Sequence, residues 1–361
     1  MIKNVMEYSG IVTKVRAMRA KLLKEKDYRA IASMHTVTDV IEYLRDTKSY
    51  GKFIRQMDES LYHRGNIEKM LIQSLYDDYT RLYLFSNMEQ KKFLKIFLKQ
   101  YEVDLIKYCL RIVFNNYNAP FDLNYKKSFF DKYSQIRIDR LITAQNINHL
   151  VDYLKGTEYY APLERIRKSE DAKLYDYDLA LDLYYFSTMW KKRKKLLDKH
   201  DLEVMTKELG MRIDLLNLQW IYRTKKYYHM VAPDIYTLLI PIQYRISNQE
   251  YKALVEAPSV EEFFRVLNET YYGRKYQFDE QNNVEGVVKQ CLEHIFATAY
   301  RNHPYSLASL CGYLFLKEEE IYKITTALEC IRYGLSERET LQYILKSESK
   351  DSRHQGGGGQ R

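Results

Sequence analysis

One amphipathic pattern occurs three times along this chain of 361 residues, and it constrains the fold more than any other feature. The copies are residues 36–44, 146–154 and 259–267. Each begins with a residue typical of a helix N-cap, whose side-chain oxygen accepts a hydrogen bond from a backbone N–H of the first turn. Apolar residues follow at spacings i, i+3, i+4 and i+7, which place them on one helix face. They are Val37, Val40, Ile41 and Leu44; Ile147, Leu150, Val151 and Leu154; and Val260, Phe263, Phe264 and Leu267.

The start of each predicted helix carries a specific capping signal. The three N-cap residues are Thr36, Asn146 and Ser259. A carboxylate three residues after a Ser or Thr N-cap can return a hydrogen bond to it, which completes a capping box. We therefore expect Glu262 to form a capping box with Ser259, and Asp39 to form a weaker one with Thr36.

The three copies keep a common register outside these helices. A shift of 110 residues brings Asp104 onto Asp214. A shift of 113 residues brings Pro120 onto Pro233. One amphipathic helix matches another by chance because all such helices share an apolar stripe, whereas caps, helices and proline junctions do not match by chance in one order. The chain is therefore predicted to be an internal triplication.

The repeat predicts three domains, at 1–118, 119–231 and 232–346, with a tail at 347–361. The boundaries fall at 115–120 and 230–234, where Pro120 and Pro233 lack a backbone donor and bias the preceding residue away from helix. The tail has no apolar side chain and contains four consecutive glycines. We expect it to be flexible.

The periodicity of the rest of the chain predicts an all-α fold. Apolar residues recur at helical rather than alternating spacing, for example at Val103, Ile106, Leu110 and Val113. No continuous apolar segment approaches the roughly 18 residues of a membrane span, and the first residues lack the organisation of a signal peptide. We therefore expect a soluble protein made in the cytosol.

The cysteines do not have the spacing of a zinc site. All four lie within helical patterns, where thiols behave as small buried hydrophobes. We expect them to be buried and reduced. They are Cys109, Cys291, Cys311 and Cys330.

A net charge of +9 and 35 tyrosines raise the possibility of nucleic-acid binding. Basic side chains neutralise phosphates and bases stack on tyrosine rings, and Tyr227–Tyr228 and Tyr271–Tyr272 each lie beside basic residues. The 48 acidic residues are dispersed, however, and no nucleic-acid motif accompanies the tyrosines. We favour tyrosines that pack between helices with their hydroxyls at the water boundary.

The densest basic run, residues 190–199, has two interpretations. It is either a solvated helix face or a surface for an anionic protein or lipid headgroups.

No residue of the chain is assigned to catalysis, to cofactor binding or to metal binding. Glycine-rich phosphate loops, His-Glu-x-x-His, Cys-x-x-Cys and Gly-x-Ser-x-Gly are all missing from the sequence. His294 and His303 are nine residues apart, which suits ordinary histidines better than metal ligands. The acidic pairs and runs at 77–78 and 318–320 are typical of helix starts and solvated faces.

The beginning of the chain carries a family resemblance. Residues 15–23 (Val-Arg-Ala-Met-Arg-Ala-Lys-Leu-Leu), then Asp27-Tyr28 and the helix ending at 44–50 resemble the start of the C subunit of V-type and A-type rotary ATPases. In eukaryotic V-ATPases the same subunit is designated d. The similarity extends over roughly residues 5–345. The threefold repeat is what that family's fold would produce.

This resemblance implies a funnel of three pseudo-equivalent helical domains with pseudo-threefold symmetry. Such a funnel caps the membrane rotor ring (c/K type) and receives the central shaft subunits (D and F type). It implies a non-catalytic central-stalk subunit without cofactor or nucleic acid. This subunit links ATP hydrolysis or synthesis to proton or sodium translocation. It further implies a peripheral position on the cytoplasmic side of the membrane, held through the ring. The chain matches the shorter prokaryotic pattern of the family, which indicates a bacterial or archaeal source.

Two alternatives from other classes stay open. A helical-repeat scaffold fits the triplication, although its usual periods of about 20–50 residues are shorter than this one. A basic, tyrosine-rich RNA-binding protein would bind with steep salt dependence.

Overall fold

The computed structural model describes residues 2–115, 122–169, 172–279 and 284–345. Within these ranges every regular element is a helix, which confirms the all-α prediction. None of the helices in them is long and apolar enough to cross a membrane. The predicted boundary at 115–120 lies almost entirely outside the described ranges, and the tail at 347–361 lies wholly outside them.

The element order repeats along the chain: a long helix, a group of short helices, and a second long helix. The first set is α1 (Ile2–Arg19), then α2 (Glu25–Ala32), α3 (Val37–Arg45), α4 (Gly51–Ile54) and η1 (Glu59–Leu61), then α5 (Arg64–Phe85). The second is α6 (Met88–Phe114), then α7 (Asn124–Tyr133), α8 (Ile138–Leu141), α9 (Ile147–Tyr153) and α10 (Tyr160–Arg167), then α11 (Leu174–Leu196). The third is α12 (Lys199–Arg223) with the π-helical turn η2 (Thr224–Tyr228), then α13 (Ala232–Leu238), α14 (Asn248–Glu256) and α15 (Val260–Glu269), then α16 (Val284–Asn302). The chain continues with α17 (Ala308–Arg332) and α18 (Glu337–Ile344).

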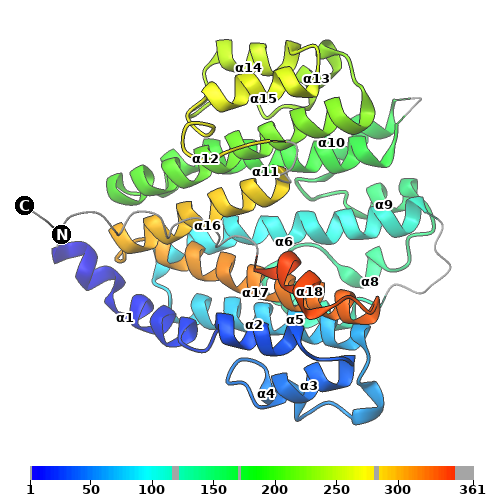
Figure 1. Ribbon diagram of the computed structural model, residues 1–361, viewed down its shortest axis with the longest axis vertical. Coiled ribbons are helices and arrows are strands. Elements are labelled where there is room, and N and C mark those ends of the chain that lie inside the picture. The colour runs from blue at the N-terminus through cyan, green and yellow to red at the C-terminus, as the bar shows by residue number, and fades with distance from the viewer. Residues whose placement is uncertain (1, 116–121, 170–171, 280–283, 346–361) are drawn as a thin grey trace, which may run out of the picture.

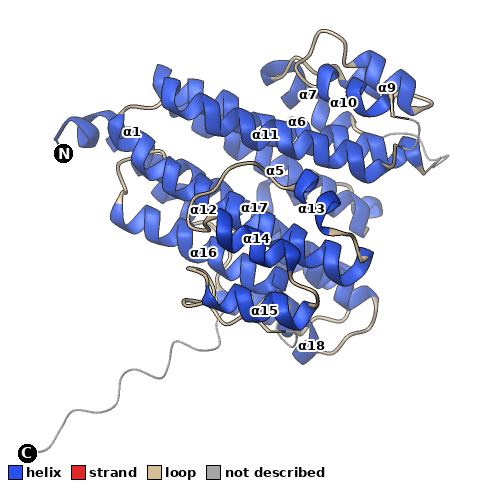
Figure 2. Cartoon of the chain, turned by 90° about the horizontal axis from the view of Figure 1, so that it is seen from above, coloured by secondary structure: helices blue, strands red, loops and turns tan. Residues whose placement is uncertain are grey.

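The short helices form three separate groups around the long ones (Figure 1). In that view α13–α15 lie at the top, α8 and α9 at the right, and α3 and α4 at the bottom. Seen from above, α7, α9 and α10 remain apart from α13–α15 (Figure 2). The long helices pack in pairs, α6 against α11 and α12 against α16.

Helix α17 brings the end of the chain back to its beginning. It leaves α16 and packs against α1, α2, α3 and α5, and α18 packs against α2. The first group of short helices is therefore held by helices from both ends of the sequence.

The predicted N-caps are confirmed in all three copies. The side chains of Thr36, Asn146 and Ser259 each accept a hydrogen bond from the backbone N–H three residues later, at 2.9–3.2 Å. The apolar stripes that follow are the buried faces of α3, α9 and α15. Their most deeply buried members are Val40, Ile41 and Leu44; Leu150, Val151 and Leu154; and Phe263, Phe264 and Leu267.

The predicted strength of the capping boxes is wrong. Thr36 has the complete box, because the Asp39 carboxylate accepts the Thr36 N–H at 3.0 Å. Glu262 instead accepts two hydrogen bonds from the Arg265 guanidinium, at 2.7 and 2.8 Å. A charged partner one turn away therefore takes the carboxylate that would have completed the box at Ser259.

The turn at 229–231 ends the long α12–η2 segment. His229 adopts a left-handed conformation with φ of 48°, which stops the helix. Pro233 then lies in the first turn of α13, where a missing N–H costs nothing.

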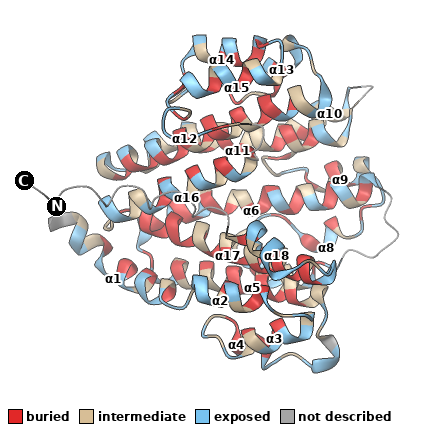
Figure 3. Cartoon of the chain, in the orientation of Figure 1, coloured by how far each residue is buried: buried red, intermediate tan, exposed pale blue. Residues whose placement is uncertain are grey.

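Buried residues line the facing sides of the long helices (Figure 3). One apolar cluster joins α1–α11 with α17, α18 and the face of α12 that meets them, and it also takes in Leu238 at the end of α13 and Phe296 of α16. A second cluster packs most of the buried apolar residues of α13–α16 on the remaining face of α12. The four cysteines are buried and unpaired, as predicted.

Candidate functional site

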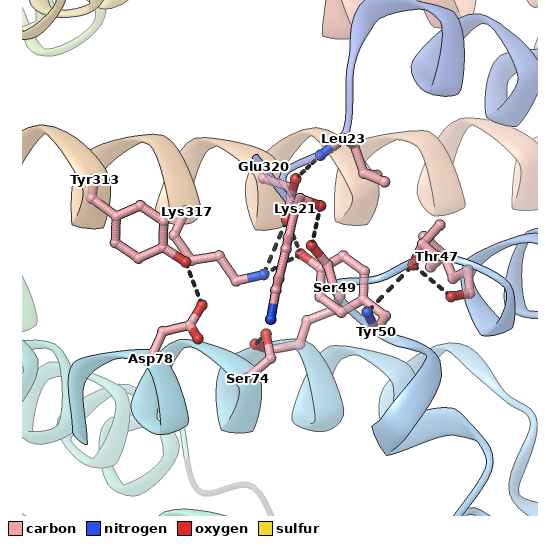
Figure 4. Close-up of polar contacts among 12 residues, drawn as sticks. Lys21, Leu23, Thr47, Ser49, Tyr50, Ser74, Asp78, Tyr313, Lys317 and Glu320 are labelled. Carbon is pink, nitrogen blue, oxygen red and sulfur yellow. Dashed lines mark hydrogen bonds and ion pairs between the residues drawn. The ribbon is translucent and has the colours of Figure 1, made fainter. Parts of the chain in front are cut away.

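A buried polar cluster joins α17 to the first group of helices (Figure 4). We call it the closing cluster and define it as Tyr50, Asp78, Tyr313, Lys317 and Glu320. Lys317 and Glu320 form an ion pair of 3.0 Å, and each side chain is only 2% exposed. The Lys317 ammonium also donates to the Tyr50 hydroxyl at 2.8 Å, and that hydroxyl donates to the Glu320 carboxylate at 2.6 Å.

Further bonds satisfy most of the remaining polar atoms of this cluster. The second Glu320 oxygen accepts the backbone N–H of Leu23, which lies between α1 and α2. Tyr313 donates its hydroxyl to Asp78 of α5 at 2.6 Å. Burial and the neighbouring carboxylate hold the pKa of Tyr50 well above its ordinary value, so the phenol stays a donor.

The closing cluster overturns one expectation from the sequence. The acidic residues at 77–78 and 318–320 were expected on solvated faces or at helix starts. Asp78 and Glu320 instead lie in the middle of α5 and α17, and each accepts a hydrogen bond from a tyrosine. Their partners come from distant parts of the chain, so no local pattern could have identified them.

The same tyrosine-to-carboxylate contact occurs in the other two copies. Tyr159 donates to Glu102 of α6 at 2.5 Å, and Tyr272 donates to Asp214 of α12 at 3.0 Å. All three tyrosines are fully or almost fully buried. Their hydroxyls therefore bond inside the protein and not at the water boundary that we predicted for tyrosines. Each one ties a group of short helices to a long helix.

A threonine precedes each of these tyrosines by two or three residues and fixes the local turn. Thr47, Thr157 and Thr270 each donate a hydroxyl to the backbone carbonyl three residues earlier, at 2.7 Å in all three copies. Each hydroxyl also accepts a backbone N–H at 3.3 Å. The repeat thus extends to individual hydrogen bonds.

A cavity of about 240 Å³ lies between the α6/α11 pair and the α12/α16 pair. Asp104 and Gln100 of α6, Asp182 of α11 and Arg212 of α12 supply its polar lining. Lys107 pairs with Asp182 at 2.6 Å. Arg212 lies 3.3 Å from the Gln100 side-chain oxygen.

The described residues contain no group of three His, Cys, Asp or Glu side chains placed to hold a metal ion. His303 lies beside His200, with ring centres 5.4 Å apart, and the pKa of His303 is lowered by burial. Burial raises the pKa of the Cys109 and Cys291 thiols to about 12, so neither is a ready nucleophile.

The two tyrosine pairs considered for base stacking differ in exposure. Tyr227 and Tyr228 are exposed in η2, which follows α12, whereas Tyr272 is fully buried and donates to Asp214. Only Tyr271 of the second pair is accessible. The basic run at 190–199 spans the end of α11 and the start of α12, where Arg193 lies over the Trp190 ring at 3.4 Å.

These features define a class of protein: an all-helical chain that holds three groups of short helices against long helices through buried tyrosine–carboxylate contacts. The family model described as ATP synthase (C/AC39) subunit matches residues 11–343. The chain belongs to this family, which confirms the resemblance noted in the sequence.

Similar proteins cover almost the whole chain. The C subunit of the A-type ATP synthase of Thermococcus kodakarensis is 24% identical over 344 residues, covering 93% of this chain and 90% of the relative. The corresponding protein of Methanocaldococcus jannaschii is 22% identical, covering 91% and 84%. That of Archaeoglobus fulgidus is 22% identical, covering 92% and 94%.

Proposed function

We propose that this chain is the non-catalytic central-stalk subunit of a V/A-type rotary ATPase. It couples the shaft subunits (D and F type) to the membrane rotor ring (c/K type), so that ATP hydrolysis or synthesis is linked to proton or sodium translocation. In this proposal the three sequence copies form three domains arranged as a funnel. The subunit lies on the cytoplasmic side of the membrane and is attached through the ring.

Family membership and the names of the relatives support the assignment to the complex. The observation that best supports a coupling role is the closure of the chain by α17, with its buried ion pair and tyrosine bonds. Moving one charge through 100 mV is worth about 2.3 kcal/mol. A coupler that bends or opens would dissipate that work, so closely packed, cross-bonded helices suit the task.

The test is reconstitution of the complex with and without this chain in sealed vesicles. We expect ATP hydrolysis by the catalytic head to persist without the chain, whereas ATP-driven ion uptake is lost and returns when the chain is added back. Affinity capture of the tagged chain from detergent-solubilised membranes should recover head, shaft and ring subunits together. Ion uptake that does not depend on the chain would refute the coupling role.

The scaffold and RNA-binding alternatives predict different captures. A scaffold would bring down proteins unrelated to the ATPase. An RNA-binding protein would bring down RNA that is released by moderate salt.

A further inference from the structure

The third copy carries a surface pocket rich in basic side chains, which we call the third-copy pocket and define as Arg245, Glu250, Tyr271, Arg274 and Lys275. We propose that it binds a single nucleotide, with the phosphates on the three basic side chains and the base on the Tyr271 ring. Nucleotide binding here does not depend on the coupling role proposed above.

One buried carboxylate fixes the walls of this pocket. Asp214 of α12 accepts the backbone N–H of Arg245 at 2.7 Å and the Tyr272 hydroxyl at 3.0 Å. It also accepts the hydroxyl of Tyr251, the residue after Glu250, at 3.0 Å. The three segments that line the pocket are therefore tied to the same side chain, and the basic groups stand on a fixed backbone.

Within the described ranges, the three basic side chains of the pocket form no ion pair. Arg274 donates its Nε–H to the backbone carbonyl of Glu269 at 3.0 Å, which leaves its two terminal nitrogens for a ligand. The Arg245 guanidinium lies 5.1 and 5.2 Å from the centres of the Tyr244 and Tyr271 rings. Both guanidinium groups can therefore still bind an anion through charge-assisted hydrogen bonds.

An unpaired cation at the position of Arg274 distinguishes the third copy among the described residues. The residues two positions after the buried tyrosines of the three copies are Lys52, Ala161 and Arg274. Lys52 pairs with Asp77 of α5, and alanine has no charge to pair. The shared framework of the copies does not account for the charge at Arg274, whereas a bound anion does.

The charge and the size of the pocket suit a phosphate ester. Its single carboxylate, Glu250, already accepts the N–H and the hydroxyl of Ser247, at 2.7 and 2.8 Å, so the three cations remain in excess. A phosphate group carries about −1.5 to −2 charges near neutral pH. The cavity of about 460 Å³ falls within the range of about 300–1,000 Å³ that small-molecule pockets occupy, so it has room for more than the phosphates.

One tyrosine ring is available for a base. Tyr271 lines the pocket and is 37% exposed, whereas Tyr272 is fully buried. A base stacks on a tyrosine ring whatever its identity, and proteins that bind single strands stack successive bases on successive rings. A single accessible ring therefore suits one nucleotide better than an RNA strand.

The experiment measures the binding of ADP to the purified full-length chain by isothermal titration calorimetry at low salt. We expect Arg245→Gln and Arg274→Gln each to weaken the ADP affinity at least about tenfold, because each removes a charge-assisted bond to phosphate. We expect Tyr271→Leu to weaken the ADP affinity about tenfold and to leave the affinity for pyrophosphate within about twofold, because pyrophosphate has no base to stack.

The matched control is Arg265→Gln on α15, an exposed arginine that is already paired with Glu262 and Glu269. It should leave the ADP affinity within about twofold. The substituted side chains are all exposed, and the bonds to Asp214 come from backbone and from other tyrosines. All four variants should therefore keep the wild-type circular dichroism and unfolding midpoint.

Several results would overturn nucleotide binding. They are the absence of saturable ADP binding by the wild-type chain, ADP binding that the arginine variants retain, and tighter binding of single-stranded oligouridine or of vesicles containing phosphatidic acid than of ADP. An affinity that falls in both arginine variants but not in Tyr271→Leu would assign the pocket to phosphate alone and refute the contact with a base. None of these results bears on the coupling role, which the reconstitution in sealed vesicles tests separately.

Discussion

Replacing Lys317 by methionine is the most direct test of the closing cluster. The change removes the ammonium that pairs with Glu320 and leaves the carboxylate buried, where among the described residues only Tyr50 and Leu23 still donate to it. Removing one partner of a buried ion pair costs about 3–5 kcal/mol, because the other charge stays in a poorly solvated place. We expect a loss of stability in that range for Lys317→Met.

A double-mutant cycle separates the pair from its surroundings. Glu320→Gln keeps an acceptor for Tyr50 but leaves the Lys317 ammonium without a counter-charge, so it should be similarly destabilising. The double variant contains neither charge and should be about 2 kcal/mol more stable than the sum of the single effects predicts. The matched control is Lys92→Met, which breaks a 2.7 Å pair with Glu89 that also spans three residues but is more than half exposed. It should cost less than about 1 kcal/mol.

The assay is urea unfolding followed by circular dichroism, with midpoints compared at a common slope. Amide hydrogen exchange at Leu23, whose N–H bonds to Glu320, gives a local reading that does not depend on a two-state transition. A Lys317→Met variant as stable as Lys92→Met would refute the reasoning, as would a double variant whose cost equals the sum of the single costs.

Three further changes test other parts of the structure. Glu208 is buried, and no group in the described part of the chain forms a hydrogen bond with either of its carboxyl oxygens. Burial raises its pKa from 4.5 to about 8. The folded state therefore holds this proton more tightly than the unfolded chain, so the stability of the wild type falls as the pH rises between these two values. Glu208→Gln should be on the order of 3 kcal/mol more stable than wild type at pH 8 and equally stable near pH 4. Urea unfolding at a series of pH values measures this difference. A Cβ at Gly210 would lie 2.4 Å from the Tyr244 ring, so Gly210→Ala should lower the free energy of unfolding by about 1–3 kcal/mol. A Cβ at Gly10 would meet nothing within 4 Å. Gly10→Ala should therefore raise the free energy of unfolding by up to about 1 kcal/mol, and with it the melting temperature. Thr157→Val removes a repeated hydroxyl bond of 2.7 Å and should cost about 1 kcal/mol in urea unfolding; a neutral effect would show that the turn does not depend on it.

Local features of the fold could be predicted from the sequence because they depend on residues within one or two turns. The N-caps at Thr36, Asn146 and Ser259 and the apolar stripes after them are of this kind. The error at Glu262 is also local in origin. Its competing partner, Arg265, was visible in the sequence, but the choice between two nearby partners depends on side-chain geometry.

The closing cluster could not be predicted, since Tyr50 and Glu320 are 270 residues apart. The run at 318–320 looks like an ordinary solvated helix face, but Glu320 is buried, Glu318 accepts a hydrogen bond from Tyr101 at 2.9 Å, and Glu319 pairs with Lys289 at 2.5 Å. The tyrosine–carboxylate contacts had one available signal. A tyrosine follows the threonine in each copy, but the threefold recurrence of Thr and Tyr does not reveal which carboxylate each hydroxyl meets.

The return of α17 to α5 has a consequence for synthesis on the ribosome. The first group of short helices is translated early. The hydrogen-bond partners of Tyr50 and Asp78, which are Lys317 and Tyr313 respectively, are translated near the end. Until then the nascent chain exposes the apolar faces of α2, α3 and α5 that α17 covers. Chains that terminate before residue 308 therefore lack α17 and leave these apolar faces uncovered.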